Sequence, residues 1–220
     1  ASDVYKRQTE SAIDFLTKGK NKGFFLMVEG GKIDWACHGN DAATVFHEVA
    51  DMANAIKVAY EFYKKHPKET LIVVTADHET GGIALGTGKY ALNLKALENQ
   101  KASAEVLSKK ISDLRKAKNN HVAWEDIKNL LSEEMGFWSV LPITWEQEKK
   151  LRDEYEKSFV RNKVEFAESM YAKTEPMAAK AKEVMDQIAM VGWTSGGHSA
   201  GYVPVFAIGA GSDLFIGKMD

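Results

Sequence analysis

The chain has 220 residues, of which 45% are hydrophobic and 27% are charged, and its formal net charge is −2 at pH 7. These values are typical of a globular protein with one sizeable domain, or one domain with an insertion. The near-neutral charge argues against nucleic acid as the main partner, because a basic face is what neutralises phosphates. The single cysteine excludes an internal disulfide and a cysteine-based zinc site. No apolar run approaches the roughly 20 residues that span a bilayer.

The N-terminal region predicts one helix followed by one strand. Residues 1–8 match neither pattern and are treated as an unmatched tail. A short helix is expected from Thr9, which would be its N-cap, to a glycine at position 19 or 23. The continuous apolar run of residues 24–28 then predicts a strand buried on both faces of a parallel sheet.

The next segment predicts a long helix and a second buried strand. Asn40 or Asp41 would cap the helix, apolar residues recur at three- and four-residue steps between positions 45 and 63, and Pro67 would end it. Residues 71–75 form the second apolar run. The order strand, helix, strand predicts a βαβ unit and an open parallel sheet.

From about residue 89 to 191 the sequence is rich in Lys and Glu and reads as a helical insertion. Helices are expected around residues 107–114, around 127–131 with Gly136 at the end, and from a Thr144–Gln147 capping box through Leu151, Tyr155 and Phe159. The strand pattern returns at residues 203–208. The expected organisation is therefore an α/β core of residues 9–88 and 192–220, interrupted by the insertion.

Acidic and histidine side chains follow both predicted strands, namely Glu29, Asp34, His38, Asp77 and His78. Ligands collect at the carboxyl ends of strands in open α/β sheets. Zinc binds imidazole and carboxylate, with about three protein ligands at a catalytic site, so five candidates suggest two metals. From the residues alone, other readings stay open: Asp77 could cap a helix, Glu29 could be solvated, and His198 could be a surface residue. Cys37 is expected to be a small packed residue.

Three ordered stretches resemble motifs of the alkaline phosphatase family: VEGGKIDWACHGND, IVVTADHETGG and TSGGHSAGYVPVFAIG, which begin at residues 28, 72 and 194. The resemblance implies a three-layer α/β/α sandwich. It also implies hydrolysis of phosphate monoesters through a phosphoserine, with two zinc ions and usually one magnesium ion. Motifs in the right order with the right internal spacing are specific together, although each alone is only moderately so.

The resemblance also assigns roles to individual residues. Asp34, His38 and His198 would bind the first zinc, and Asp77 and His78 the second. Glu29 would bind the magnesium. Trp35 stands at a position that varies in this family with the character of the third metal site, which leaves magnesium specificity open.

Other family features are absent from the sequence. It contains neither the T-D-S-A block that carries the nucleophile nor the G-D-G-M-G block, and Arg115, Arg152 and Arg161 match no phosphate-binding arginine. The chain therefore resembles the C-terminal half of an alkaline phosphatase, and alone it is expected to be inactive or nearly so. The family implies a homodimer and a periplasmic or extracellular location. The alternatives are another hydrolase of the superfamily, such as a phosphodiesterase or sulfatase, and a non-catalytic metal-binding fragment.

Overall fold

The computed structural model describes residues 4–19, 23–88, 90–171 and 173–218. Residues 1–3 of the expected tail and residue 89 at the expected start of the insertion lie outside these ranges. The chain divides into two compact units. Unit 1 comprises residues 1–34, 46–79 and 199–220, and unit 2 comprises residues 35–45 and 80–198.

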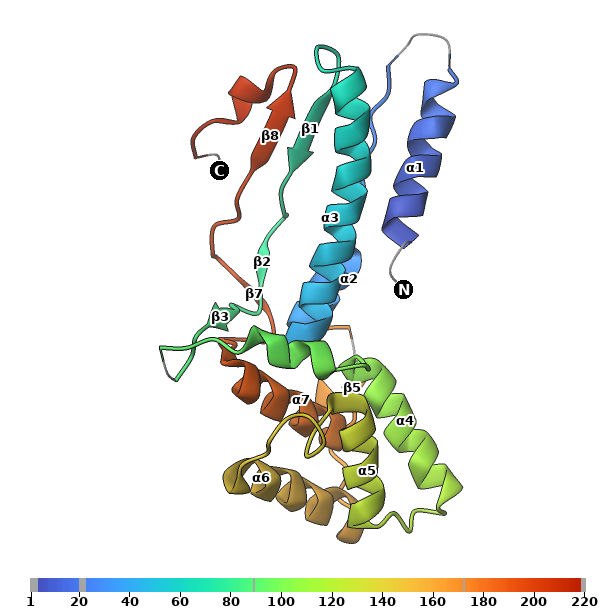
Figure 1. Ribbon diagram of the computed structural model, residues 1–220, viewed down its shortest axis with the longest axis vertical. Helices are drawn as coiled ribbons and strands as arrows, with labels where there is room; N and C mark the ends of the chain where they lie inside the picture. The colour runs from blue at the N-terminus through green and yellow to red at the C-terminus, as the bar shows by residue number, and fades with distance from the viewer. Residues whose placement is uncertain (1–3, 20–22, 89, 172, 219–220) are drawn as a thin grey trace. The chain divides into compact units, whose positions relative to one another are not determined.

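Helices make up most of the regular structure (Figure 1). The α-helices are α1 (Val4–Thr17), α2 (Gly31–His38), α3 (Ala42–Lys65), α4 (Ala104–Ala117), α5 (Trp124–Met135), α6 (Trp145–Tyr155) and α7 (Pro176–Ala189). Two 3₁₀ turns lie at Leu94–Asn99 and Ser212–Phe215, and a π-helix at Glu156–Val160. The strands are β1 (Leu71–Val74), β2 (Glu79–Thr80), β3 (Ala84–Leu85), β4 (Ala167–Glu168), β5 (Lys173–Thr174), β6 (Val191–Gly192), β7 (His198–Ser199) and β8 (Phe206–Gly209).

In unit 1, strands β1 and β8 form an antiparallel pair that lies beside α3 (Figure 1). Leu71 is opposite Gly209 and Val74 is opposite Phe206. The strand expected at residues 71–75 is confirmed to within one residue. The strand expected at residues 203–208 is confirmed from Phe206 onward. The parallel sheet expected from residues 24–28 and 71–75 is not seen among the described pairs: β1 pairs antiparallel with β8, and the pairs β3–β6 and β4–β5, which were not predicted, are antiparallel as well. An apolar run indicates burial, but it carries no information about the direction of the neighbouring strand.

The N-terminal part of unit 1 departs from the prediction twice. Helix α1 begins at Val4, so the expected tail is partly helical. Thr9 is inside this helix and is no N-cap, because its hydroxyl donates to the carbonyl of Tyr5 at 2.7 Å. Residues 24–28 have no assigned strand, and Phe25 and Met27 are exposed. Within the described chain, no other segment pairs with residues 24–28. A segment is assigned as a strand only when its backbone is hydrogen-bonded to a neighbouring strand, so the apolar run alone does not make one.

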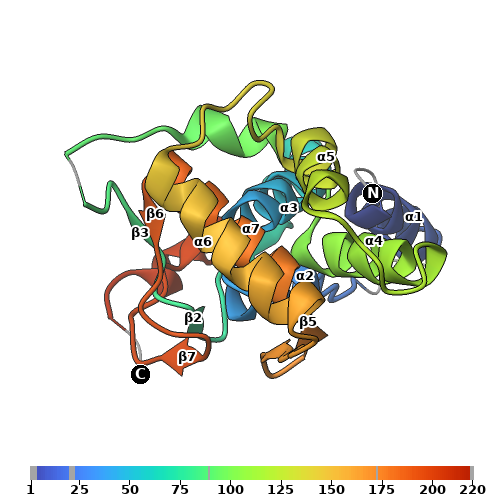
Figure 2. The same ribbon diagram turned by 90° about the horizontal axis from the view of Figure 1, so that it is seen from below.

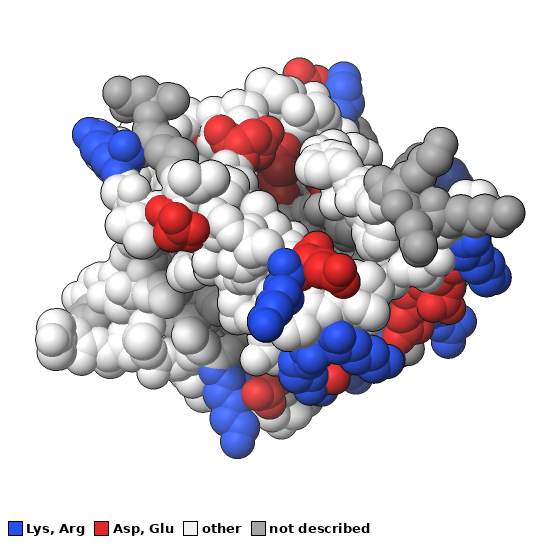
Figure 3. Space-filling view, turned by 90° about the horizontal axis from the view of Figure 1, so that it is seen from above, with Lys and Arg blue, Asp and Glu red and all other residues white. Residues whose placement is uncertain are grey.

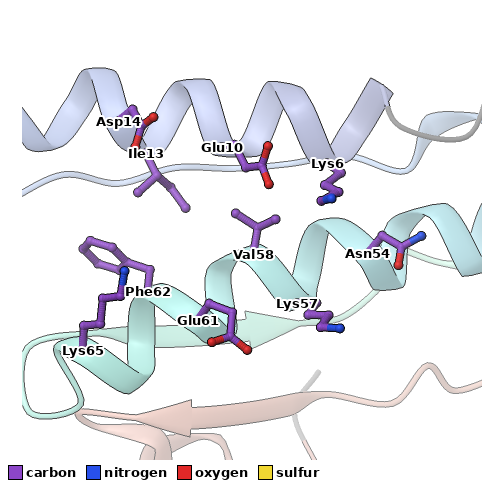
Figure 4. A pocket seen from close by; sticks show the side chains of 10 residues that line it. All are labelled: Lys6, Glu10, Ile13, Asp14, Asn54, Lys57, Val58, Glu61, Phe62 and Lys65. Carbon is purple, nitrogen blue, oxygen red and sulfur yellow. The ribbon is translucent and has the colours of Figure 1, made fainter.

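A groove of about 460 Å³ separates α1 from α3 in unit 1 (Figure 4). Ile13 on α1 and Val58 and Phe62 on α3 are its apolar side chains, and Asn54 and charged side chains of both helices line the remainder. The facing sides of α1 and α3 are therefore mainly charged, with only a few apolar side chains among the residues that line the groove. On the face drawn in Figure 3, basic and acidic side chains are interspersed. No described helix is long and apolar enough to cross a membrane.

Unit 2 contains the main hydrophobic core, to which helices α4, α5, α6 and α7 all contribute. Figure 2 shows α6 lying along α7, and the two helices are in contact. The predicted helices are confirmed as α4, α5 and α6. Most members of their apolar stripes are buried, as the spacing predicted, namely Leu107, Ile111, Ile127, Leu131 and Leu151, whereas Leu114, Leu130 and Tyr155 are only partly buried.

The predicted helix ends of unit 2 are also confirmed. The Thr144 hydroxyl accepts from the Gln147 backbone N–H at 3.3 Å, and the Gln147 side chain accepts from Thr144 N–H at 3.0 Å. Gly136 ends α5 with φ +70°, a left-handed conformation that favours glycine. Phe159, expected on the same helix as Leu151, lies in the π-helix that follows α6.

Arg115 is a structural residue of the unit 2 core. Its Nη2 lies 2.8 Å from Oε1 of Glu175, and its guanidinium stacks on the Phe159 ring at 3.5 Å. Burial raises the pKa of Glu175, and the Arg115 charge opposes that shift. Glu175 in turn caps α7 by accepting from the N–H groups of Met177 and Ala178. This arginine therefore stabilises the start of α7, which agrees with its failure to match a phosphate-binding position.

Candidate metal centre

His38 is the last residue of α2 and is buried, with 3% of its surface exposed. Its Nδ1 lies 2.7 Å from the carbonyl oxygen of Gly196, and its Nε2 lies 3.0 Å from Nε2 of His198. Because a carbonyl oxygen only accepts, Nδ1 must carry the proton, and in the neutral imidazole Nε2 then has the lone pair that faces His198. A backbone carbonyl that fixes the tautomer in this way is the usual support of a metal-binding histidine.

The loop that carries His198 is held by the backbone of Gly81. Gly81 N–H donates to the Gly197 carbonyl at 2.9 Å, and the N–H groups of Thr194 and Ser195 donate to the Gly81 carbonyl at 3.0 and 3.2 Å. Gly81 has φ +85°, and an added Cβ would lie 2.8 Å from the Trp193 ring. The glycine following the Asp77–His78 motif is therefore required, because only glycine allows this close approach.

In unit 1, the structure brings Asp34 and His78 together. A carboxylate oxygen of Asp34 and a ring nitrogen of His78 lie within 4.8 Å of each other. Asp77 Oδ2 lies 3.2 Å from His78 Nε2, and the Asp77 side chain is 86% exposed. The carboxylate of Glu79, the next residue, accepts from the Ser199 hydroxyl. Asp34 and His78 are thus neighbouring oxygen and nitrogen donors of the kind that zinc prefers, and Asp77 is joined to them here only through its contact with His78.

The motif that begins at Val28 is partly helical, which differs from the expected loop. Residues 29–38 were expected to form a loop that wraps around metals, with helix only from Asn40. Instead residues 31–38 are helical. Asp34 and His38 are four residues apart, so their side chains project from the same face of this helix.

Glu29 lies outside helix α2, the helix that carries Asp34 and His38. Glu29 precedes α2 and is exposed. Its carboxylate lies close to Gly31, because a Cβ added at Gly31 would be 3.1 Å from Glu29 Oε1. In the part of the chain that the structure describes, no hydrogen bond or ion pair joins Glu29 to the other predicted ligands. Cys37 is buried, as expected.

Tyr171 contacts this region and was not predicted from the sequence. Its ring meets the His38 ring edge-on at 5.1 Å and stacks with Trp35 at 5.7 Å. Tyr171 lies in the expected insertion, and no motif or periodicity marks it. The contact depends on tertiary folding alone.

Two charged residues of unit 2, Asp41 and Lys182, form hydrogen bonds that fix the backbone after His38. Asp41 caps α3 by accepting from Thr44 N–H at 3.2 Å, which confirms one of the two predicted caps, and it also accepts from Gln100 and Ala104 at 2.8 Å. The Lys182 ammonium donates to the carbonyl of Gly39, and burial lowers its pKa. The Lys182 bond ties the residue after α2 to α7, and the Asp41 bonds tie the start of α3 to Gln100 and to the start of α4.

Comparison with known proteins identifies the family. Residues 3–220 match the family model described as Alkaline phosphatase. Alkaline phosphatase 3 of Bacillus subtilis (strain 168) is 34% identical over 226 residues, covering 98% of this chain and 41% of that protein. Alkaline phosphatase of Escherichia coli (strain K12) is 43% identical over 72 residues, covering 33% of this chain and 15% of that protein.

Solved structures agree with the sequence comparisons. The cold-active alkaline phosphatase of a psychrophilic Shewanella species is 29% identical with a TM-score of 0.75, covering 100% of this chain and 48% of that one. The Thermus thermophilus alkaline phosphatase, at 24% identity, supports the fold with a TM-score of 0.62 and covers 94% of this chain and 42% of that one. The chain spans about two fifths of the length of the two Bacillus subtilis relatives. It has the α/β fold of these enzymes, and it belongs to the alkaline phosphatase family.

Proposed function

We propose that this chain supplies metal ligands to a zinc-dependent phosphatase that hydrolyses phosphate monoesters, through a phosphoserine, in the complete enzyme. Asp34, His38 and His198 would hold the first zinc, and Asp77 and His78 the second. Glu29 would serve a magnesium ion. Bound as a pair, the zinc ions would supply electrostatic stabilisation of the charge that develops on oxygen during displacement at phosphorus.

The observation that carries this proposal is the arrangement of His38. Its Nδ1 is bound to the Gly196 carbonyl, and its Nε2 lone pair is directed at His198 Nε2. The approach of Asp34 to His78 within 4.8 Å adds support, because the two are assigned to different zinc ions. Paired metals lie roughly 3.5–4 Å apart, so their ligands must be near neighbours.

Zinc binding tests the proposal directly. Chain stripped of metal should bind zinc in calorimetric titration, and His38→Ala or His198→Ala should weaken binding by at least roughly 10-fold, since even the loss of a supporting contact costs that much. His121→Ala is the matched control, because this exposed histidine of unit 2 bonds only to a local carbonyl among its described contacts. Wild-type chain that binds no zinc, or His198→Ala with unchanged affinity, would contradict the assignment.

Activity separates the proposal from its alternatives. The zinc-loaded chain alone should hydrolyse p-nitrophenyl phosphate far more slowly than a complete family member assayed beside it, because the sequence contains no T-D-S-A block. Turnover near that of the complete enzyme would refute this expectation. Faster hydrolysis of a diester than of a monoester would favour a phosphodiesterase. For the complete enzyme, the family supports a homodimer and a periplasmic or extracellular location.

A further inference from the structure

Two aromatic side chains of unit 2 lie together on its surface beside His38. Trp35 is 54% exposed and Tyr171 is 50% exposed, yet their rings stack with centroids 5.7 Å apart and an interplanar angle of 27°. Large aromatic side chains are usually buried, because each removes much apolar surface from water. A stacked pair that remains half exposed retains ring surface on which a further planar group could stack.

The pair is joined to the proposed first zinc site through His38. Trp35 and His38 are three residues apart on α2, so they project from neighbouring positions of the helix surface. The Tyr171 ring contacts both, and it meets the His38 ring edge-on at 75°. His38 is itself buried and faces His198. The aromatic pair therefore lies next to His38, whose Nε2 faces the second histidine assigned to the same metal.

The segment that carries Tyr171 is anchored on its C-terminal side. Strands β4 and β5 pair on either side of it, with Ala167 opposite Thr174. Thr174 is buried, and the next residue, Glu175, is fixed by Arg115. Tyr171 thus lies between two paired strands, of which β5 ends in the buried Thr174.

We propose that Trp35 and Tyr171 form an aromatic platform that binds the planar organic group of an aryl phosphate ester whose phosphate is at the metal centre. The inference rests on the proposed function and adds a specificity-determining role for a residue of the insertion. Stacking on an aromatic pair favours a flat aromatic group over an alkyl group by roughly 3- to 10-fold in affinity. A residue that only packed against His38 would make no such distinction.

The test compares two non-hydrolysable monoester mimics. Phenylphosphonate and ethylphosphonate are titrated calorimetrically into zinc-loaded chain, and the ratio of their dissociation constants is the readout. We expect phenylphosphonate to bind roughly 3- to 10-fold more tightly. Tyr171→Ala and Trp35→Ala should bring the ratio close to one, whereas Tyr171→Phe should retain it, because the ring remains. Tyr90→Ala, which removes a fully exposed tyrosine elsewhere in unit 2, is the matched control.

The possible failures are distinguishable. Absence of zinc uptake overturns the proposed metal centre and the platform with it. Zinc uptake without tighter phenylphosphonate binding, including binding of neither compound, overturns the platform alone. A ratio unchanged in Tyr171→Ala also overturns it. If Tyr171 only supports His38, Tyr171→Ala will weaken zinc binding and leave the phosphonate ratio as it was.

Discussion

At the scale of single residues, Asp186 shows how the fold changes the chemistry of a side chain. It lies on α7, is 6% exposed, and accepts from the indole N–H of Trp193 at 2.9 Å. Burial raises the pKa of its carboxyl from 3.8 to about 7, although the Trp193 hydrogen bond and the Lys182 charge act in the opposite direction. Nothing in the sequence around Asp186 distinguishes it from a surface aspartate.

Asp186 should make the stability of the protein depend on pH. Its folded-state pKa is raised, so its stabilisation is complete below about pH 3.8 and is lost as the pH rises through about 7. Asp186→Asn removes this titration while keeping an acceptor for Trp193. The melting temperature of wild type minus that of the variant should therefore fall between pH 4.5 and 7.5, measured by circular dichroism. Asp113→Asn, on the exposed surface of α4, should show no comparable trend, and a flat difference for Asp186→Asn would contradict the expectation.

At the scale of elements, α3 to α6 were predictable from strong local signals, α7 was expected only as part of a helical block, and α2 was not predicted. Helices α3 to α6 have apolar stripes and several recognisable ends. Helix α2 begins at a Gly-Gly pair and has only eight residues, so its periodicity is weak. The four-residue spacing of Asp34 and His38 was a usable signal, because two ligands on one face of a helix require that spacing.

The capping box of α6 should contribute measurably to stability. Thr144→Ala removes the hydroxyl that accepts from Gln147 N–H and should lower the free energy of unfolding by about 1 kcal/mol. Urea denaturation followed by circular dichroism measures the change. Thr144→Ser keeps the hydroxyl and should remain close to wild type. Equal destabilisation by both substitutions would show that the box does not stabilise the helix.

At the scale of the whole molecule, the two units differ in how much apolar surface they bury. Every member of the buried core cluster belongs to unit 2. In unit 1 the strand residues Leu71 and Phe206 remain 42% and 63% exposed, and Phe25 is 87% exposed. Local opening costs least where few buried apolar contacts are lost.

The rates of amide hydrogen exchange should therefore differ between unit 1 and unit 2. Amides of α4, α5 and α7 in unit 2 should be protected longest, and those of β1 and β8 in unit 1 should exchange earlier, as followed by mass spectrometry of peptic fragments. The terminal residues of each helix serve as an internal control, since helix ends fray in both units. Protection of β1 equal to that of α7 would contradict this expectation.

The sequence by itself determined the family, the α/β class and the positions of most helices, because these depend on residue order, spacing and local periodicity. It also nominated the six metal ligands, which remain a proposal. Only the tertiary structure decided the strand directions, the helical form of α2, the pairing of His38 with His198, and the contact of Tyr171 with His38. Each of these joins residues far apart in the chain or depends on a neighbouring element, and local pattern carries no record of which distant segment will supply the partner.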